Sequence, residues 1–179
     1  MKKLFLAVLI VGLALVVFAP VALAAPSGDL SADVKQELIR VAKANARYKD
    51  YEKALADGFI NTGECVEVPG LGGMGVHFVH IGRIMDPAIN SLEPEALLYV
   101  PTSNGYVLVG VEYIFAIGGP GDPIPDSPPP APVLFGVPFD GPMLGHGPGD
   151  GPHYDLHAWI YRANPNGTFT QFNPTVDCP

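Results

Sequence analysis

The fold of this chain is decided by residues 96–115, which read ALLYVPTSNGYVLVGVEYIF. Residues 96–100 and 106–115 are rich in aliphatic, aromatic and β-branched side chains, and such runs favour extended strands. Asn104-Gly105 lies between the two runs, where an Asn-Gly pair is typical of a tight hairpin turn. The sequence therefore predicts two adjacent antiparallel strands in this segment.

One long helix is expected before the hairpin. Apolar side chains recur with helical spacing over residues 29–57, the pattern of a helix that buries one face. Asp29 or Ser31 can cap its start, because their side-chain oxygens accept hydrogen bonds from the first free backbone N–H groups. Gly58 follows the last apolar position, where glycine readily forms a left-handed C-cap.

Two further segments favour strands, residues 76–79 and residues 153–161. Together with the hairpin and the helix they predict the α+β fold class. We expect the N-terminal helix to pack on a small, mainly antiparallel sheet or open barrel.

A long Pro/Gly-rich loop is predicted at residues 118–152, which hold 11 Pro and 9 Gly. This stretch is too rich in proline for a central strand, since proline cannot donate to a sheet ladder. We expect the loop to lie on the domain surface, because Val133, Leu134, Phe135 and Phe139 can pack; the alternative is a solvated linker.

The N-terminus has the features of a secretory signal peptide. Lys2 and Lys3 precede an apolar run at residues 4–19, and Ala22-Leu23-Ala24 offers small residues for cleavage after Ala24. An uncleaved membrane anchor is the alternative, but the run is shorter than the roughly 20 residues that a spanning helix needs. We therefore predict a signal peptide at 1–24, a single globular domain at 25–179, export to the periplasm or the extracellular space, and no stable membrane anchor after cleavage.

The predicted export affects the expected oxidation state of the two cysteines, Cys65 and Cys178. In an oxidising compartment they are expected to form a disulfide. A metal site built on cysteine is disfavoured, because the sequence has no C-x-x-C pair.

Charge and motifs exclude several classes of function. The chain carries 10 Lys+Arg against 18 Asp+Glu, a formal net charge of −8, which argues against nucleic acid as a partner. No phosphate loop or dinucleotide fingerprint is present, so no nucleotide cofactor is expected. The nucleophile elbow of serine hydrolases is also missing from the sequence.

The last predicted strand carries a row of polar side chains. Alternate residues of a strand share a face, so His153, Asp155 and His157 should point the same way, with Trp159 and Tyr161. Imidazoles at alternate positions suit metal ligation, and the carboxylate suits orientation of an imidazole. The alternative is an exposed polar face.

Glu112 is the second signal, because it interrupts the apolar run at residues 106–115. A buried carboxylate needs a cation, a metal or a proton held by a raised pKa. The sequence has no Lys or Arg between Arg83 and Arg162, so histidine or a metal is the natural partner. The alternative is an edge strand on which Glu112 meets water.

Two other histidines complete the candidate set. His77 and His80 should lie on opposite faces of a strand, and we expect His77 to join the site because glycines precede it. Met74 precedes His77 with the same spacing with which Met143 precedes His146, and thioether plus imidazole suits copper. The candidate ligands of a Cu or Zn ion are therefore His77, Glu112, His146, His153 and His157.

Motifs along the chain resemble a group of small secreted bacterial proteins. They are MGVHF (74–78), PEALLY (94–99), VEY (111–113), FDGPM (139–143), HYDLHAW (153–159) and FNP (172–174). The resemblance covers most of the chain between Asn45 and Cys178 and implies an exported bacterial protein. It carries no activity, cofactor or catalytic residue over to this sequence.

Three hypotheses follow. The first is a secreted protein that binds Cu or Zn through a His/Glu cluster, where an open coordination position would permit hydrolysis or redox chemistry. The second is a non-catalytic cell-surface or extracellular interaction module that uses the Pro-rich loop. The third is a metal-free acid–base enzyme that uses Glu112 and His157. The first and third both require His77, Glu112 and His157 to converge.

Overall fold

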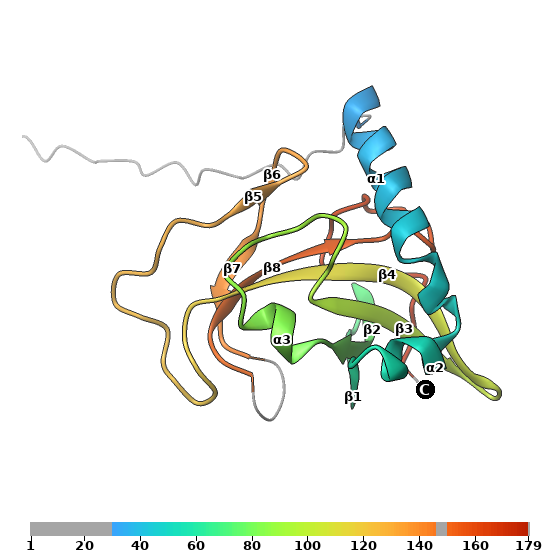
Figure 1. Cartoon of the computed structure of the whole chain (residues 1–179), viewed down its shortest axis with the longest axis horizontal. Helices are drawn as coiled ribbons and strands as arrows, with labels where there is room; N and C mark the ends of the chain where they lie inside the picture. The colour runs from blue at the N-terminus through green and yellow to red at the C-terminus, as the bar shows by residue number, and fades with distance from the viewer. Residues whose placement is uncertain (1–29, 146–149, 179) are drawn as a thin grey trace, which may run out of the picture.

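A curled sheet of six antiparallel strands forms the centre of the molecule in the computed structural model, which describes residues 30–145 and 150–178 (Figure 1). The strand order is β1-β2-β3-β4-β8-β7. These strands are β1 (Ile60–Val68), β2 (Gly72–Val79), β3 (Ala96–Thr102), β4 (Gly105–Ala116), β7 (Asp140–Met143) and β8 (His153–Ala158). The predicted hairpin is confirmed, with Thr102 of β3 paired with Gly105 of β4.

The helical part precedes the sheet, so the predicted α+β class is confirmed, but the prediction of one unbroken helix is wrong. The segments are α1 (Ala32–Ala44), the 3-10 turn η1 (Ala46–Lys49) and α2 (Tyr51–Ala56), and a short α3 (Ile81–Ile84) follows β2. Asn45 ends α1, because its side-chain amide donates to the carbonyls of Val41 and Leu92. A side chain that competes for backbone partners in this way interrupts a helix.

Both predicted ends of the helical region are confirmed. Ser31 caps α1 by accepting the backbone N–H of Val34 at 3.3 Å. Gly58 follows the C-cap of α2 with a φ of +95°, a left-handed conformation that a side chain would disfavour.

Tyrosine hydroxyls tie the helical segments to the sheet. Tyr161 donates to the carbonyl of Ala42 at 2.8 Å, and Tyr99 of β3 donates to the carbonyl of Tyr48 at 2.6 Å. These bonds satisfy carbonyl groups that the interrupted helix leaves without helical partners. The N-terminal helical segments α1, η1 and α2 therefore cover one face of the sheet (Figure 1).

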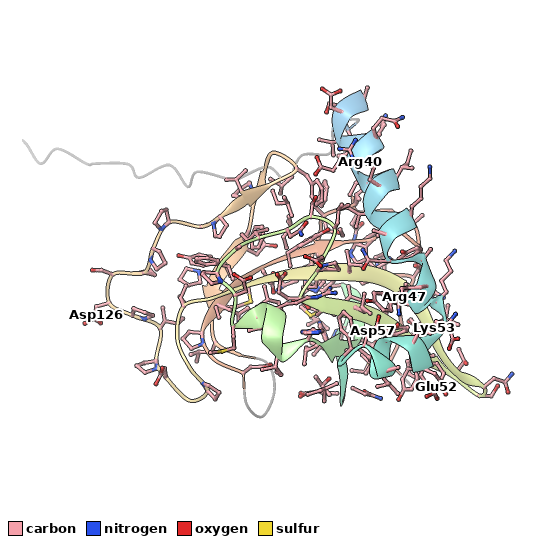
Figure 2. The ribbon with its side chains drawn as sticks, viewed as in Figure 1. Arg40, Arg47, Glu52, Lys53, Asp57 and Asp126 are labelled. Atoms are coloured by element: carbon pink, nitrogen blue, oxygen red, sulfur yellow. A yellow bond between two sulfur atoms is a disulfide. The ribbon has the colours of Figure 1, made fainter. Side chains whose placement is uncertain are left out.

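The charged side chains of the helices face solvent (Figure 2). Arg40 and Lys53 are 63% and 56% exposed, and Arg47 pairs with Asp57 at 2.7 Å. Exposed pairs of this kind add little to stability. These cationic side chains thus form part of the solvent-exposed outer surface of α1, η1 and α2.

The two faces of the sheet bury different kinds of side chain. The helix-covered face holds the main apolar core, which includes Phe78, Leu97 and Val111. A smaller apolar cluster lies on the opposite face; its members are Leu98, Val109, Trp159 and Val176. The rest of that opposite face carries the polar candidates described below.

The C-terminal segment closes over this second face. Cys178 is bonded to Cys65 of β1, which confirms the predicted disulfide. Asn173 forms a bridge with Gly73, and a Cβ at neighbouring Gly72 would overlap the Asn173 carbonyl oxygen. Only glycine permits so close an approach of the two backbones.

Within the predicted Pro/Gly-rich loop at 118–152, residues 131–139 include side chains that pack on the main core. The loop includes the small hairpin β5 (Val133–Leu134) and β6 (Val137–Pro138), which the sequence did not predict, and the equally unpredicted edge strand β7. Phe139 is only 3% exposed and belongs to the main core. Pro142 lies in β7, an edge strand, where proline is tolerated.

Two predictions fall outside the described residues: the signal peptide at 1–24 and the ligand candidate His146. Within residues 30–145 and 150–178, no helix combines the length and the apolar character needed to cross a lipid bilayer.

Candidate metal centre

Three side chains from three strands converge on the face opposite α1, η1 and α2. They are His77 of β2, Glu112 of β4 and His157 of β8, and one ligand atom from each lies within 4.8 Å of the others. His77 Nε2 is 3.3 Å from Glu112 Oε2, and His157 Nε2 is 3.9 Å from Glu112 Oε1. The cluster could therefore hold a metal ion.

Strand register brings these residues together. Glu112 lies directly opposite His157 in the β4–β8 pair and opposite Ala96 in the β3–β4 pair. Directly opposed residues share a face of the sheet. Because Ala96 presents only a methyl group there, His77 can reach across β3 to Glu112.

The cluster is buried and incompletely satisfied. The side chains of His77, Glu112 and His157 are 12%, 2% and 0% exposed. Glu112 Oε2 and both ring nitrogens of His157 form no hydrogen bond with any described residue. Buried polar atoms are normally hydrogen-bonded, and unbonded atoms that face one another at this spacing could bind a metal ion.

Burial also perturbs the acid–base properties of the cluster. Desolvation raises the pKa of Glu112, against the opposing effect of His157. Burial alone would lower the pKa of His157, but the neighbouring carboxylates of Glu112 and Asp155 outweigh it and raise that pKa. Both shifts favour the protonated forms, and metal ions displace protons from their ligands, so metal binding to this cluster would depend on pH.

A carboxylate stands behind the cluster. Asp155 Oδ1 is 3.7 Å from His157 Nδ1, and Asp155 Oδ2 is 3.9 Å from His153 Nε2. Both separations exceed a hydrogen bond but permit strong electrostatic interaction at these buried positions. A carboxylate behind a ligating imidazole fixes ring orientation and raises ligand basicity.

The predicted face of β8 is confirmed for His153, Asp155 and His157, but His153 lies outside the three-residue cluster. Its Nδ1 contacts the carbonyl oxygen of Gly151 at 2.9 Å. The expectation that Tyr161 shares this face is wrong, because β8 ends at Ala158 and Tyr161 packs on the helices.

The structure also shows where Glu112, His80 and the two candidate methionines lie. Glu112 is not at an edge in contact with water, since β4 is an inner strand and the residue is 2% exposed. His80 caps α3, because its Nδ1 accepts the backbone N–H of Arg83. Met74 and Met143 do not line the cavity next to the cluster.

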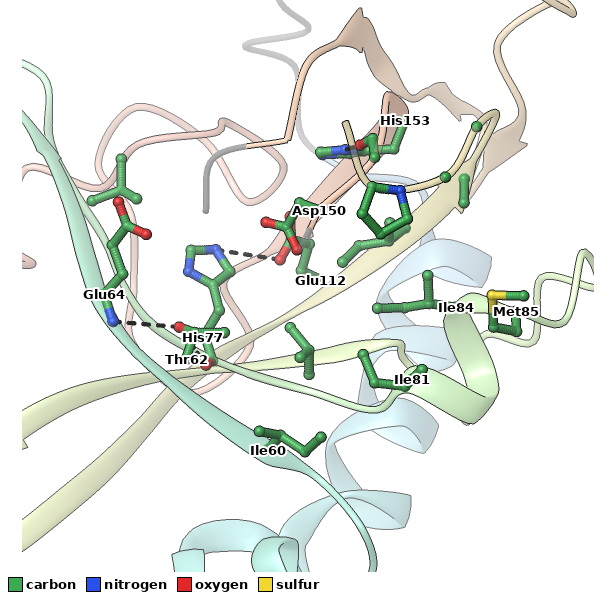
Figure 3. Close-up of a pocket in the computed structure, with 18 residues that line it drawn as sticks. Ile60, Thr62, Glu64, His77, Ile81, Ile84, Met85, Glu112, Asp150 and His153 are labelled. Carbon is green, nitrogen blue, oxygen red and sulfur yellow. Dashed lines mark hydrogen bonds and ion pairs between the residues drawn. The ribbon is translucent and has the colours of Figure 1, made fainter. Parts of the chain in front are cut away.

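A cavity of about 460 Å³ opens over the cluster (Figure 3). His77, Glu112, Asp150 and His153 gather on one side of it, and Ile81, Ile84 and Met85 lie on another. His157 does not line the cavity, so the cluster forms part of its wall with one imidazole buried behind.

One cavity wall was missed by sequence reasoning. Alternate residues of β1 line the cavity: Ile60, Thr62, Glu64 and Val66. Apolar Ile60 and Val66 lie an even number of positions apart, as expected for residues on one face of a strand, and this spacing could have indicated β1. Glycine and polar residues in the segment concealed it.

Two imidazoles and one carboxylate form a ligand set found in mononuclear metal sites of proteins. Three protein ligands leave a coordination position for water or another molecule, and here that position would face the cavity. A metal held in this way can lower the pKa of bound water or polarise a carbonyl group.

Comparison of the chain with protein-family models, with curated proteins and with solved structures finds no match. The function is therefore inferred from the geometry of the cluster and its cavity.

Proposed function

We propose that this protein is an exported metalloprotein that binds one divalent transition metal ion, zinc or copper, through His77, Glu112 and His157. The proposal is carried by one observation: Glu112 Oε2 and both nitrogens of His157 are buried without a hydrogen-bond partner among the described residues, in a cluster of ligand spacing. A metal ion would satisfy the facing atoms in a single step.

Charge balance supports a divalent ion. Glu112 and Asp155 are 2% and 0% exposed, and the histidines that lie within 3.9 Å of their carboxylates carry charge only when protonated. Burying unbalanced charge is costly. A dication bound by neutral imidazoles would balance the two carboxylates.

The chemistry of the ligand atoms limits which metal ions the cluster would bind. Imidazole suits zinc and copper(II), and a carboxylate completes a known type of three-ligand zinc site. The sulfur ligands that favour copper(I) do not belong to the cluster, and Met143 Sδ accepts a weak hydrogen bond from Gln171 instead. We therefore expect zinc or copper(II) rather than copper(I).

The exported location is supported by two features. The predicted signal peptide at 1–24 would direct the chain out of the cytoplasm. The Cys65–Cys178 disulfide fits an oxidising compartment, where such bonds persist.

The test is metal analysis of protein produced without a histidine tag. After equilibrium dialysis against Zn²⁺ or Cu²⁺, the wild type should hold one ion per chain, and Glu112→Gln should bind at least 100-fold more weakly. Glu95→Gln is the matched control, because Glu95 is also 2% exposed but lies outside the cluster. The proposal fails if neither ion binds, or if the two variants bind alike.

One observation favours a metal-free acid–base site as the second candidate. Glu112 both lines the cavity and lies 3.3 Å from His77, so it could exchange a proton with a molecule in the cavity. Lack of metal uptake, together with loss of an activity in Glu112→Gln, would favour this function.

A further inference from the structure

The cavity over the cluster has the size of a small-molecule site. Its volume of about 460 Å³ lies within the roughly 300–1,000 Å³ typical of pockets that bind drug-sized ligands. The proposed metal would lie in its wall, because His77 and Glu112 line it. A bound molecule would thus meet the open coordination position.

One part of the lining is strongly apolar and reaches the surface. Ile60, Ile81 and Met85 line the cavity although they are 54%, 50% and 77% exposed. Figure 3 shows Ile81, Ile84 and Met85 together on α3 and just after it, apart from the polar side. An apolar surface next to a polar centre fits a ligand with an apolar body and one polar end.

The charged lining excludes one class of ligand. Glu64, Glu112 and Asp150 contribute carboxylates, and neither Lys nor Arg occurs among the described lining residues. The nearby Arg83 is turned elsewhere, since its guanidinium donates to the Pro94 carbonyl and lies 5.0 Å from the centroid of the Phe59 ring. An anionic group in the cavity would meet the carboxylates of Glu64 and Asp150, whereas Glu112 and the nearby Asp155 would already offset the charge of the proposed dication.

We propose that the cavity binds a small uncharged molecule whose apolar body contacts the α3 side and whose single neutral donor atom coordinates the metal. This inference rests on the proposed metal site and adds the chemical class of its ligand. The donor is a neutral nitrogen or oxygen, such as an azole nitrogen or a hydroxyl group.

Cobalt(II) provides a spectroscopic test, since its visible absorption changes when a ligand enters its coordination sphere. Cobalt-loaded protein is titrated with three probes: 1-methylimidazole, 1-phenylimidazole and 4-(imidazol-1-yl)benzoate. We expect 1-phenylimidazole to bind about tenfold or more tightly than 1-methylimidazole, because its ring buries apolar surface. The benzoate should lose most of that gain through its negative charge.

Two matched variants locate the apolar contact. Ile81→Glu changes a helical isoleucine that is 50% exposed and lines the cavity, whereas Ile39→Glu changes one that is 45% exposed on α1 outside it. Their similar exposure makes the cost to folding comparable. Ile81→Glu should reduce the advantage of the phenyl probe at least fivefold, and Ile39→Glu should leave it unchanged, with cobalt binding equal in both.

The outcomes separate the two proposals. If cobalt binds but 1-phenylimidazole shows no advantage, or both variants behave alike, the ligand class is wrong and the metal site stands. If the benzoate binds as tightly as 1-phenylimidazole, exclusion of anions is wrong and the inference falls. If cobalt does not bind to the wild type, the metal site and the inference fail together.

Discussion

Glu112 and His157 face each other across strands β4 and β8, with Glu112 Oε1 3.9 Å from His157 Nε2 and both side chains buried. A shift of the strand pairing by one residue would place them on opposite faces of the sheet. The apolar residues beside them, Val111 and Ala158, belong to the helix-side core and hold this register. Apolar packing on the helix-covered face of the sheet thereby positions Glu112 and His157 on the opposite face.

Metal binding should stabilise the folded protein. A ligand that binds only the native state adds about 2.7 kcal/mol at a free concentration of 100 times Kd. We expect Zn²⁺ to raise the Tm of the wild type by several degrees, and a chelator to reverse the rise. Differential scanning calorimetry measures this. Equal rises in the wild type and in His157→Ala would contradict binding at this cluster.

Asp155 should act as a positioning residue for His157. Asp155→Asn keeps the shape but removes the charge behind the imidazole, and loss of such a partner typically weakens metal affinity by about 10–100-fold. Competition with a chromogenic chelator measures the change. Asp140→Asn serves as the control, because exposed Asp140 lies opposite Asp155 on β7 but outside the cluster. A larger loss in the control would oppose this role.

Glu95 should make stability depend on pH. Its carboxylate is 2% exposed and accepts the Ile114 N–H, and burial raises its pKa from 4.5 to about 7. The folded state therefore holds this proton more tightly than the unfolded state does. The stabilisation is fully present below about pH 4.5 and is lost as the pH rises through about 7.

The variant Glu95→Gln isolates this effect, since it retains an acceptor for Ile114 but does not titrate. The free energy of unfolding of the variant minus that of the wild type should increase by about 3 kcal/mol between pH 4.5 and pH 8. Urea denaturation at several pH values gives both curves. Curves that stay parallel across this range would show that Glu95 does not titrate as expected.

The disulfide should contribute substantially to stability. Replacing both Cys65 and Cys178 by Ser should lower the free energy of unfolding by about 2–5 kcal/mol, because the bond constrains a long loop in the unfolded chain. Denaturant unfolding of the wild type with and without reductant provides the comparison. If reductant lowers the free energy of unfolding of the wild type but not that of the double variant, the disulfide itself is responsible for the stabilisation.

Much of the fold could be predicted because its signals are local. The β3–β4 hairpin follows from two apolar runs and an Asn-Gly turn. The interruption of the helix could not be predicted, since it depends on the bond of Asn45 to Leu92, far along the chain. Strand β1 was missed because its burial is partial and its pairing with β2 is irregular.

The candidate site was predictable as a set of residue types but not as a geometry. Glu112 stood out as a carboxylate among apolar residues, and the alternation of β8 placed His157 beside Asp155. Periodicity within single strands does not reveal that His77 reaches Glu112 across β3. That approach depends on register and on the small side chain of Ala96.

The disulfide of β1 also constrains how the protein is made. Cys65 and Cys178 are 113 positions apart, so Cys65 leaves the ribosome long before its partner is synthesised. Its sulfur cannot form the native bond until the segment that carries Cys178 is available. The strand that walls the cavity can therefore be locked by this bond only after Cys178 has been synthesised and has reached it.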